Sequence, residues 1–166
     1  MKSLEEIHEL ELTHKFREAV QSLEERLERG LQDKDTILRL AYLYWDSWVG
    51  VAMTEGKGDE ARFTKRLVEL YEEWGTMYGH DPEWQLRFGV MMTMEGYNFG
   101  NRDEWLVRGR GLLEQAARHE NFFGLVARMR IAVDAEDYEQ SEQLKKEILN
   151  HKDYGQSKGL LGTYPL

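Results

Sequence analysis

Two long apolar stretches, ILRLAYLYWDSWVGVAM at residues 37–53 and WQLRFGVMMTMEGYNF at residues 84–99, decide the fold class of this chain. Each stretch is too rich in large side chains to be solvated and too long to be a buried strand, so each predicts a core helix. They begin about 48 residues apart, and a more amphipathic segment follows each of them. We therefore expect an all-α protein built from stacked antiparallel helical hairpins.

Amphipathic segments on both sides of these stretches bring the expected number of helices to about eight. Residues that commonly begin or end helices mark several boundaries. They are Ser3 with Glu6 (a capping box), Gly30, Asp33 or Asp35, Asp81 and Pro82. The expected helices cover residues 3–13, 15–30, 37–53, 61–79, 84–99, 105–118, 121–134 and 137–150. We expect one helical-repeat domain over residues 1–151 and an irregular tail over residues 152–166 that packs on it.

Four glycines lie inside two of the expected helices, at Gly89, Gly96, Gly109 and Gly111. Each costs the helix about 1 kcal/mol relative to alanine. Such a cost is usually offset where two helices cross at close distance, so these positions predict close helix crossings.

The composition excludes several classes of function. The 166 residues include no cysteine, which excludes disulfide bonds, thiolate metal sites and cysteine nucleophiles. There are 31 acidic and 22 basic residues, a formal net charge of −9, so the phosphates of nucleic acids would be repelled. The predicted partner is another protein, one with a basic surface.

Two segments share a pattern at the start of a helix. In KFREAVQSLEERL (residues 15–27) and DYEQSEQLKKEIL (residues 137–149), an aromatic residue is followed three positions later by a small one. These pairs are Phe16 with Ala19 and Tyr138 with Ser141. Ile37, Leu40, Ala41 and Tyr44 form a further pattern of large, large, small and aromatic residues within the first apolar stretch.

These patterns resemble the two helices of a tetratricopeptide repeat (TPR). The resemblance implies a right-handed α-solenoid whose first helices line a concave surface that binds peptides or proteins. The two central units depart from the family pattern, because they are about 48 rather than 34 residues long. Most units also lack the proline that closes a repeat.

Other short motifs do not indicate catalysis or metal binding. Glu5 with His8 and Glu11 with His14 fit the Glu-x-x-His spacing of di-iron sites, but those sites need further glutamates on facing helices. We expect a solvated charged face here and no metal. No phosphate-binding loop or serine nucleophile motif is present. The sequence therefore predicts a protein that is not an enzyme, has no catalytic residues and uses no cofactor.

The candidate partner-binding residues come from the faces of the core helices that the repeat pattern directs outward. If Ile37, Leu40, Ala41 and Tyr44 pack inward, as the repeat pattern implies, Tyr42, Trp45 and Asp46 project toward the concave side. By helix geometry, Trp45 also shares a stripe with Ala41 and Tyr44. The same projection gives Glu83, Leu86, Val90 and Met94 in the second core helix, with Arg128 or Arg130 in the last helix pair. Of these, the predicted partner-binding residues are Glu83, Val90, Met94 and Arg130. Tyr and Trp are the residues that most often anchor interfaces. Large aromatics and methionines are also common in cores, and burial of these residues remains open.

The leading functional hypothesis is a non-catalytic protein-binding module with an acidic, aromatic-containing groove. One form of it is an immunity protein that neutralises a bacterial toxin by charge and shape complementarity. The alternative is a sensor for a small ligand or peptide, or a cofactor-free enzyme, with a pocket between the core helices near Trp45, Met91 and Tyr97. We expect a cytoplasmic protein that does not bind membranes, because no apolar run reaches about 20 uncharged residues. A monomer and a homodimer both remain open.

Overall fold

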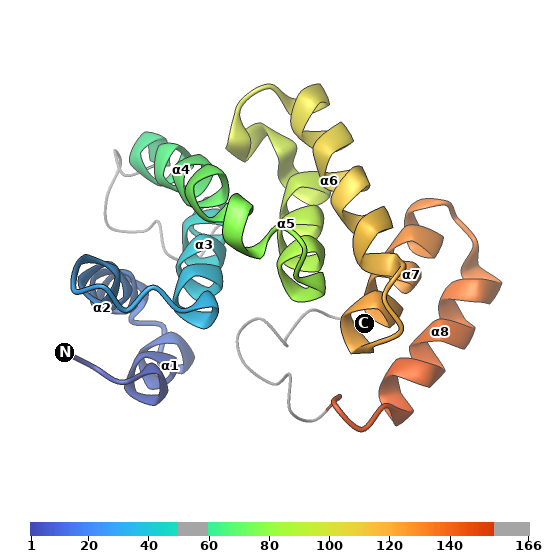
Figure 1. The fold of residues 1–166 in the computed structure, drawn as a ribbon, viewed down its shortest axis with the longest axis horizontal. Helices are drawn as coiled ribbons and strands as arrows, with labels where there is room; N and C mark the ends of the chain where they lie inside the picture. The colour runs from blue at the N-terminus through green and yellow to red at the C-terminus, as the bar shows by residue number, and fades with distance from the viewer. Residues whose placement is uncertain (50–59, 155–166) are drawn as a thin grey trace. The chain divides into compact units, whose positions relative to one another are not determined.

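The computed structural model describes residues 1–49 and 60–154, and within these ranges it contains helices and no strands. The predicted all-α fold class is thereby confirmed. The helices are α1 (Leu4–Leu12), α2 (Phe16–Glu28), α3 (Lys34–Val49), α4 (Glu60–Tyr78), α5 (Pro82–Glu95), the short 3₁₀ helix η2 (Gly96–Phe99), α6 (Arg102–Ala117), α7 (Phe122–Asp134) and α8 (Tyr138–Asn150). Figure 1 shows them in order along the chain.

The predicted caps are found at the helix ends. Ser3 and Glu6 form the capping box of α1, each bonding the backbone N–H of the other at 3.2 and 2.7 Å. Asp33, rather than Asp35, caps α3 by accepting a 2.9 Å hydrogen bond from the backbone N–H of Thr36. Asp81 caps α5. These side chains satisfy backbone donors that a helix cannot pair internally.

The second core helix is shorter than expected. Residues 84–99 were expected to form one α-helix, but α5 ends at Glu95 and residues 96–99 tighten into η2. At Gly96 the chain approaches α6 so closely that a Cβ would lie 3.1 Å from the Arg102 carbonyl oxygen. The expected continuation of the first core helix to residue 53, and the tail from residue 155 onward, lie outside the described residues.

The described residues form two compact units, 1–75 and 76–154. The boundary between them falls inside α4. The expected single repeat domain and the right-handed superhelix stay predictions.

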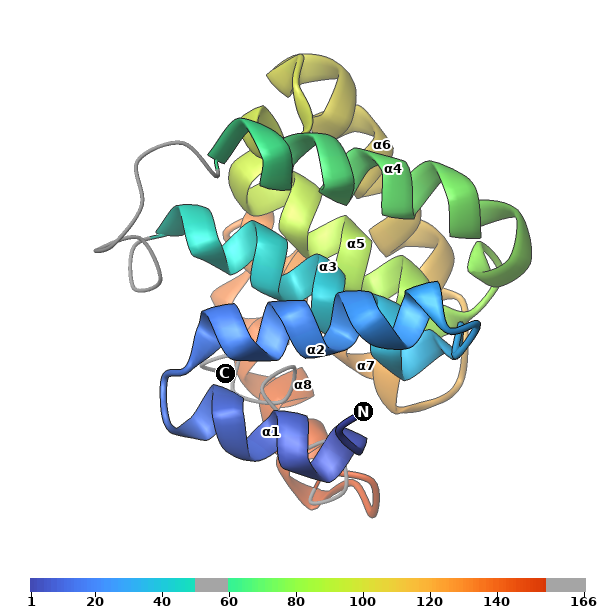
Figure 2. The same cartoon turned by 90° about the vertical axis from the view of Figure 1, so that its left-hand side faces the viewer.

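In the first unit, α1, α2 and α3 follow one another as antiparallel neighbours, with α2 packed against both others (Figure 2). Short turns join them, which favours antiparallel pairing. Their buried apolar side chains include Ile7, Ala19, Val20, Leu23, Ile37, Leu40 and Ala41. The inward stripe predicted for the first core helix is thus buried.

In the second unit, α5 packs closely against α6 where two glycines meet. A Cβ on Gly89 would lie 3.1 Å from the carbonyl oxygen of Gly109, and a Cβ on Gly109 would lie 2.7 Å from the Cβ of Met92. The prediction of a close helix crossing is confirmed at these two glycines. Gly111 differs, because no described atom lies within 4 Å of the position of its Cβ.

Two apolar clusters hold the second unit together. One joins α5, α6 and α7 through Leu86, Val90, Leu113, Ala116 and Ala127. The other joins α7 and α8 through Phe122, Leu125, Ala132, Leu144 and Ile148. Helix α7 contributes to both clusters and therefore connects the α5–α6 pair to α8.

The α1–α2 and α7–α8 turns have the same backbone conformation. The residue two positions before the second helix, His14 in one turn and Glu136 in the other, has a positive φ of 58° and 57°. The next residue donates its backbone N–H to the carbonyl five positions earlier, which is the bonding of a Schellman motif. These bonds join Lys15 to Leu10 at 2.8 Å and Asp137 to Ala132 at 2.9 Å. The two segments that share the aromatic-to-small pattern therefore begin after equivalent turns.

Candidate functional site

Three of the seven predicted partner-binding residues lie on α3, in the first unit. The centroid of the half-buried Tyr42 ring lies 5.7 Å from that of Trp45. Asp46 follows Tyr42 by four residues, on the same side of the helix, and is also half-buried. Trp45 has only 4% of its surface exposed. On helix α3, Tyr42 and Asp46 are thus accessible in part, while Trp45 is buried.

Three more of these residues follow one face of α5, in the second unit. Glu83, Val90 and Met94 are separated by seven and four residues, which places them on one stripe. An oxygen of Glu83 lies 3.7 Å from a guanidinium nitrogen of Arg87. Val90 is 7% exposed and belongs to the α5–α6–α7 cluster. Met94 is 48% exposed and is the most accessible of the three.

The seventh residue, Arg130, lies on α7 and makes a 2.9 Å ion pair with Asp134 one turn later. The structure therefore groups three of the predicted residues on α3 and four in the second unit. Their role in binding a partner stays a prediction. Of the pocket residues of the alternative hypothesis, Trp45 and Met91 are buried, and the side chain of Tyr97 lies outside what the structure describes.

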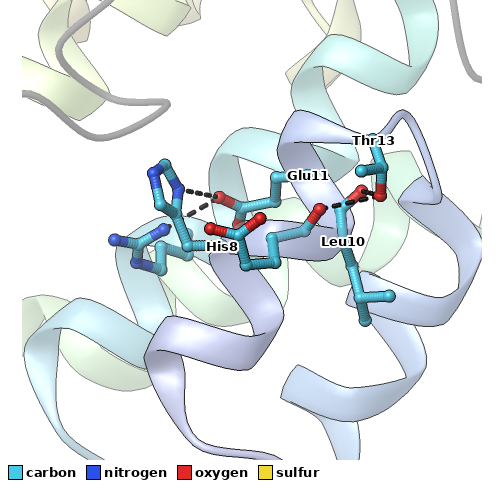
Figure 3. A network of polar contacts seen from close by, with 6 residues as sticks. His8, Leu10, Glu11 and Thr13 are labelled. Atoms are coloured by element: carbon cyan, nitrogen blue, oxygen red, sulfur yellow. Dashed lines mark hydrogen bonds and ion pairs between the residues drawn. The ribbon is translucent and has the colours of Figure 1, made fainter.

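A buried ionic network that the sequence did not predict joins α1 to α3. The Glu11 side chain is 1% exposed, and its Oε2 oxygen accepts a 2.8 Å hydrogen bond from Arg39 Nη1. The Nδ1 atom of His8 lies 3.3 Å from the same oxygen (Figure 3). The Thr13 hydroxyl donates a 2.7 Å hydrogen bond to the backbone carbonyl of Glu9, so a carbonyl in the last turn of α1 also has a side-chain partner. The first helix is thus fixed by a charge pair as well as by apolar contact.

This network corrects the expectation that Glu11 belongs to a solvated charged face. Glu11 follows the fully buried Ile7 by four residues and so lies on the buried side of α1. A carboxylate in such a position needs a cation, which Arg39 supplies. His14, the other half of the Glu-x-x-His motif, is exposed in the turn after α1. The signal in the sequence was a charged residue at a core-facing helical position.

A second polar network centres on Tyr44, which is itself buried. Its hydroxyl donates a 2.6 Å hydrogen bond to Glu24 on α2, and Arg62 on α4 donates to the same carboxylate oxygen at 2.6 Å. The Tyr44 ring stacks on Phe63 with centroids 5.1 Å apart. Burial and the hydrogen bond to Glu24 raise the pKa of Tyr44 well above its usual value. The network therefore ties three helices of the first unit together around a neutral hydroxyl.

Tyr138 is the most exposed tyrosine among those whose side chains are described, with 67% of its surface accessible. It is the first residue of α8, and Glu136, Asp137 and Glu139 flank it in the sequence. Sequence reasoning used Tyr138 only as part of the repeat pattern. Its acidic neighbours were the available sign that this aromatic residue lies at the surface.

Neither network is arranged as a metal site. Among residues 1–49 and 60–154, no group of three or more acidic or histidine side chains is placed to hold a metal ion. In the same part of the chain, no helix combines the length and the apolar character needed to cross a membrane.

Comparison of the chain with protein-family models, with curated proteins and with solved structures finds no match.

Proposed function

We propose that this chain is a non-catalytic protein-binding module that recognises a partner with a basic surface. The observation that carries the proposal is the pairing of Tyr42 and Asp46 on one side of α3, both half-buried. A tyrosine supplies flat contact area at low cost in conformational entropy, and a neighbouring carboxylate can receive a lysine or arginine. The net charge of −9 would speed encounter with a cationic partner.

The more specific form of this proposal is a TPR-like helical-repeat protein that acts as an immunity protein against a cationic toxin. The aromatic-to-small pairs at the starts of α2 and α8, Phe16 with Ala19 and Tyr138 with Ser141, support a repeat origin, because both small residues are buried at equivalent positions of their helices. An inhibitor of this kind needs charge and shape complementarity rather than catalytic groups. It would block the basic surface with which the toxin holds its own target.

The experiment is an affinity purification from the source cell with three forms of the protein: wild type, Tyr42→Ala with Asp46→Asn, and Tyr138→Ala. Tyr138 is a matched control because it is an exposed tyrosine on another helix. The proposal expects a basic protein that the wild type and the control retain and the double variant loses, with capture weakening as salt is raised. Circular dichroism must show that the double variant stays folded.

Identical captured proteins from all three forms would contradict the α3 assignment. Capture of an acidic partner, or binding that does not weaken with salt, would contradict the electrostatic part of the proposal. Trp45 is a poor choice for this test because it is buried. Its truncation would confuse loss of binding with loss of folding.

A further inference from the structure

Helix α4 carries the chain from one compact unit to the other. It is continuous from Glu60 to Tyr78, and the first unit ends at Gly75 while the second begins at Thr76. Within the described residues this is the one place where the chain passes between the units. Within the described residues, a change in the orientation of the two units would therefore act on the backbone of this part of α4.

Gly75 is a glycine that packing does not explain. A Cβ at Gly75 would have no atom of the described residues within 4 Å, whereas at Gly89 and Gly109 a Cβ would meet atoms of the neighbouring helix. Its φ is not among the positive values that favour glycine over other residues. A glycine in a helix interior weakens the helix, since it has more backbone freedom to lose. Neither close contact nor backbone geometry thus accounts for glycine here.

We propose that Gly75 is a hinge within α4, at which the helix bends and changes the orientation of the two units. Hinges are usually a few residues that absorb the change in backbone angles, and glycine is a common site of helix bending. The coincidence of two observations carries the inference: the position of the unit boundary, and a glycine in the last turn of α4 with no described atom within 4 Å of its Cβ position.

The hinge has a consequence for binding that rests on the proposed function. Tyr42, Trp45 and Asp46 belong to the first unit, and Glu83, Val90, Met94 and Arg130 belong to the second. A bend at Gly75 would let the two groups of residues adjust to a partner separately. The hinge itself does not depend on this role and is tested without a partner.

The test uses pairs of spin labels and pulsed electron paramagnetic resonance. The chain has no cysteine, so introduced cysteines are the only labelling sites. Glu18→Cys on α2 and Lys146→Cys on α8, both at exposed positions, report across the units. Arg110→Cys on α6 with Lys146→Cys reports within the second unit. Each pair is measured in the wild type, in Gly75→Ala and in Gly111→Ala.

Gly111→Ala is the matched control, because Gly111 also lies inside a helix with no described atom near its Cβ position. Both alanine variants should raise the melting temperature by a similar amount. Only Gly75→Ala should narrow the distribution of distances across the units, and neither should alter the pair within the second unit. A cross-unit distribution equally wide in Gly75→Ala and wild type would overturn the hinge. Equal narrowing by Gly111→Ala would also overturn it.

Discussion

Arg39 on α3 and Glu11 on α1 form a buried ion pair, with 2.8 Å between Nη1 and Oε2 and only 1% of the Glu11 side chain exposed. Removing one partner of such a pair leaves the other charge buried, which typically costs about 3–5 kcal/mol. Without Arg39, His8 at 3.3 Å is the neighbour that the Glu11 oxygen keeps, so we expect the lower end of this range. We expect Arg39→Met to lower the free energy of unfolding by about 3 kcal/mol. Urea denaturation followed by circular dichroism measures this change.

The double variant Arg39→Met with Glu11→Leu removes both charges and should recover most of the lost stability, because apolar replacements of buried pairs are often neutral. Lys65→Ala is the control. Lys65 lies 3.7 Å from Glu69 on the surface of α4 and is 77% exposed, so its loss should change stability by less than about 1 kcal/mol. If Arg39→Met lowered the free energy of unfolding no more than Lys65→Ala does, the buried pair would not be what holds α1 against α3.

The sequence was sufficient to predict the helices but not the Glu11 pair, for a physical reason. Helix periodicity and caps are local, so residues such as Ser3 and Asp81 marked their helices directly, whereas the choice between Asp33 and Asp35 needed the structure. The pairing of Glu11 with Arg39 joins residues 28 positions apart and depends on how α1 packs. The burial of Trp45 has the same origin, since a helical pattern places the indole on a stripe but does not say what covers that stripe.

Gly109 gives the second prediction, on the close crossing of α5 and α6. A Cβ there would lie 2.7 Å from the Cβ of Met92, which cannot move without moving its helix. The strain should outweigh the better helix propensity of alanine, and we expect Gly109→Ala to destabilise the protein by about 1–3 kcal/mol. Gly111→Ala, two residues later in the same helix, should instead stabilise it by up to about 1 kcal/mol. Thermal unfolding compares the two variants, and changes of the same sign would contradict the crossing geometry.

Asp33 gives a prediction about both capping and acid stability. Partial burial opposes its ionisation, but the hydrogen bonds from Thr36 and the nearby Arg26 outweigh this and lower the pKa of Asp33. Because the folded pKa lies below the unfolded one, the stabilisation is present above about pH 4 and is lost as the pH falls through the folded pKa. At neutral pH, Asp33→Ala should cost about 1 kcal/mol.

Asp35→Ala is the control for this cap, because Asp35 is exposed in the first turn of α3 and the Thr36 N–H is bonded to Asp33 instead. It should have a smaller effect than Asp33→Ala. Urea denaturation at pH 7 and at pH 3 compares the variants with the wild type. The difference in the free energy of unfolding between Asp33→Ala and the wild type should be smaller at pH 3 than at pH 7. An equal difference at both pH values would mean that ionised Asp33 does not stabilise α3.

Tyr44 gives the last prediction, at alkaline pH. Burial and the hydrogen bond to Glu24 raise the pKa of Tyr44 above its usual value near 10. Above that pH the unfolded chain loses the hydroxyl proton while the folded chain keeps it. The contribution of Tyr44 to the free energy of unfolding is therefore fully present below about pH 10. It falls as the pH rises, by up to about 1.4 kcal/mol per pH unit. At neutral pH, Tyr44→Phe should lower the free energy of unfolding by about 1 kcal/mol, because the hydrogen bond to Glu24 is removed. The variant should also lack this part of the alkaline decline.

Tyr138→Phe, at an exposed position, should match the wild type at every pH. Denaturation between pH 8 and about pH 11 measures the slopes, and an equally steep decline in Tyr44→Phe and wild type would show that Tyr44 ionises without unfolding the network.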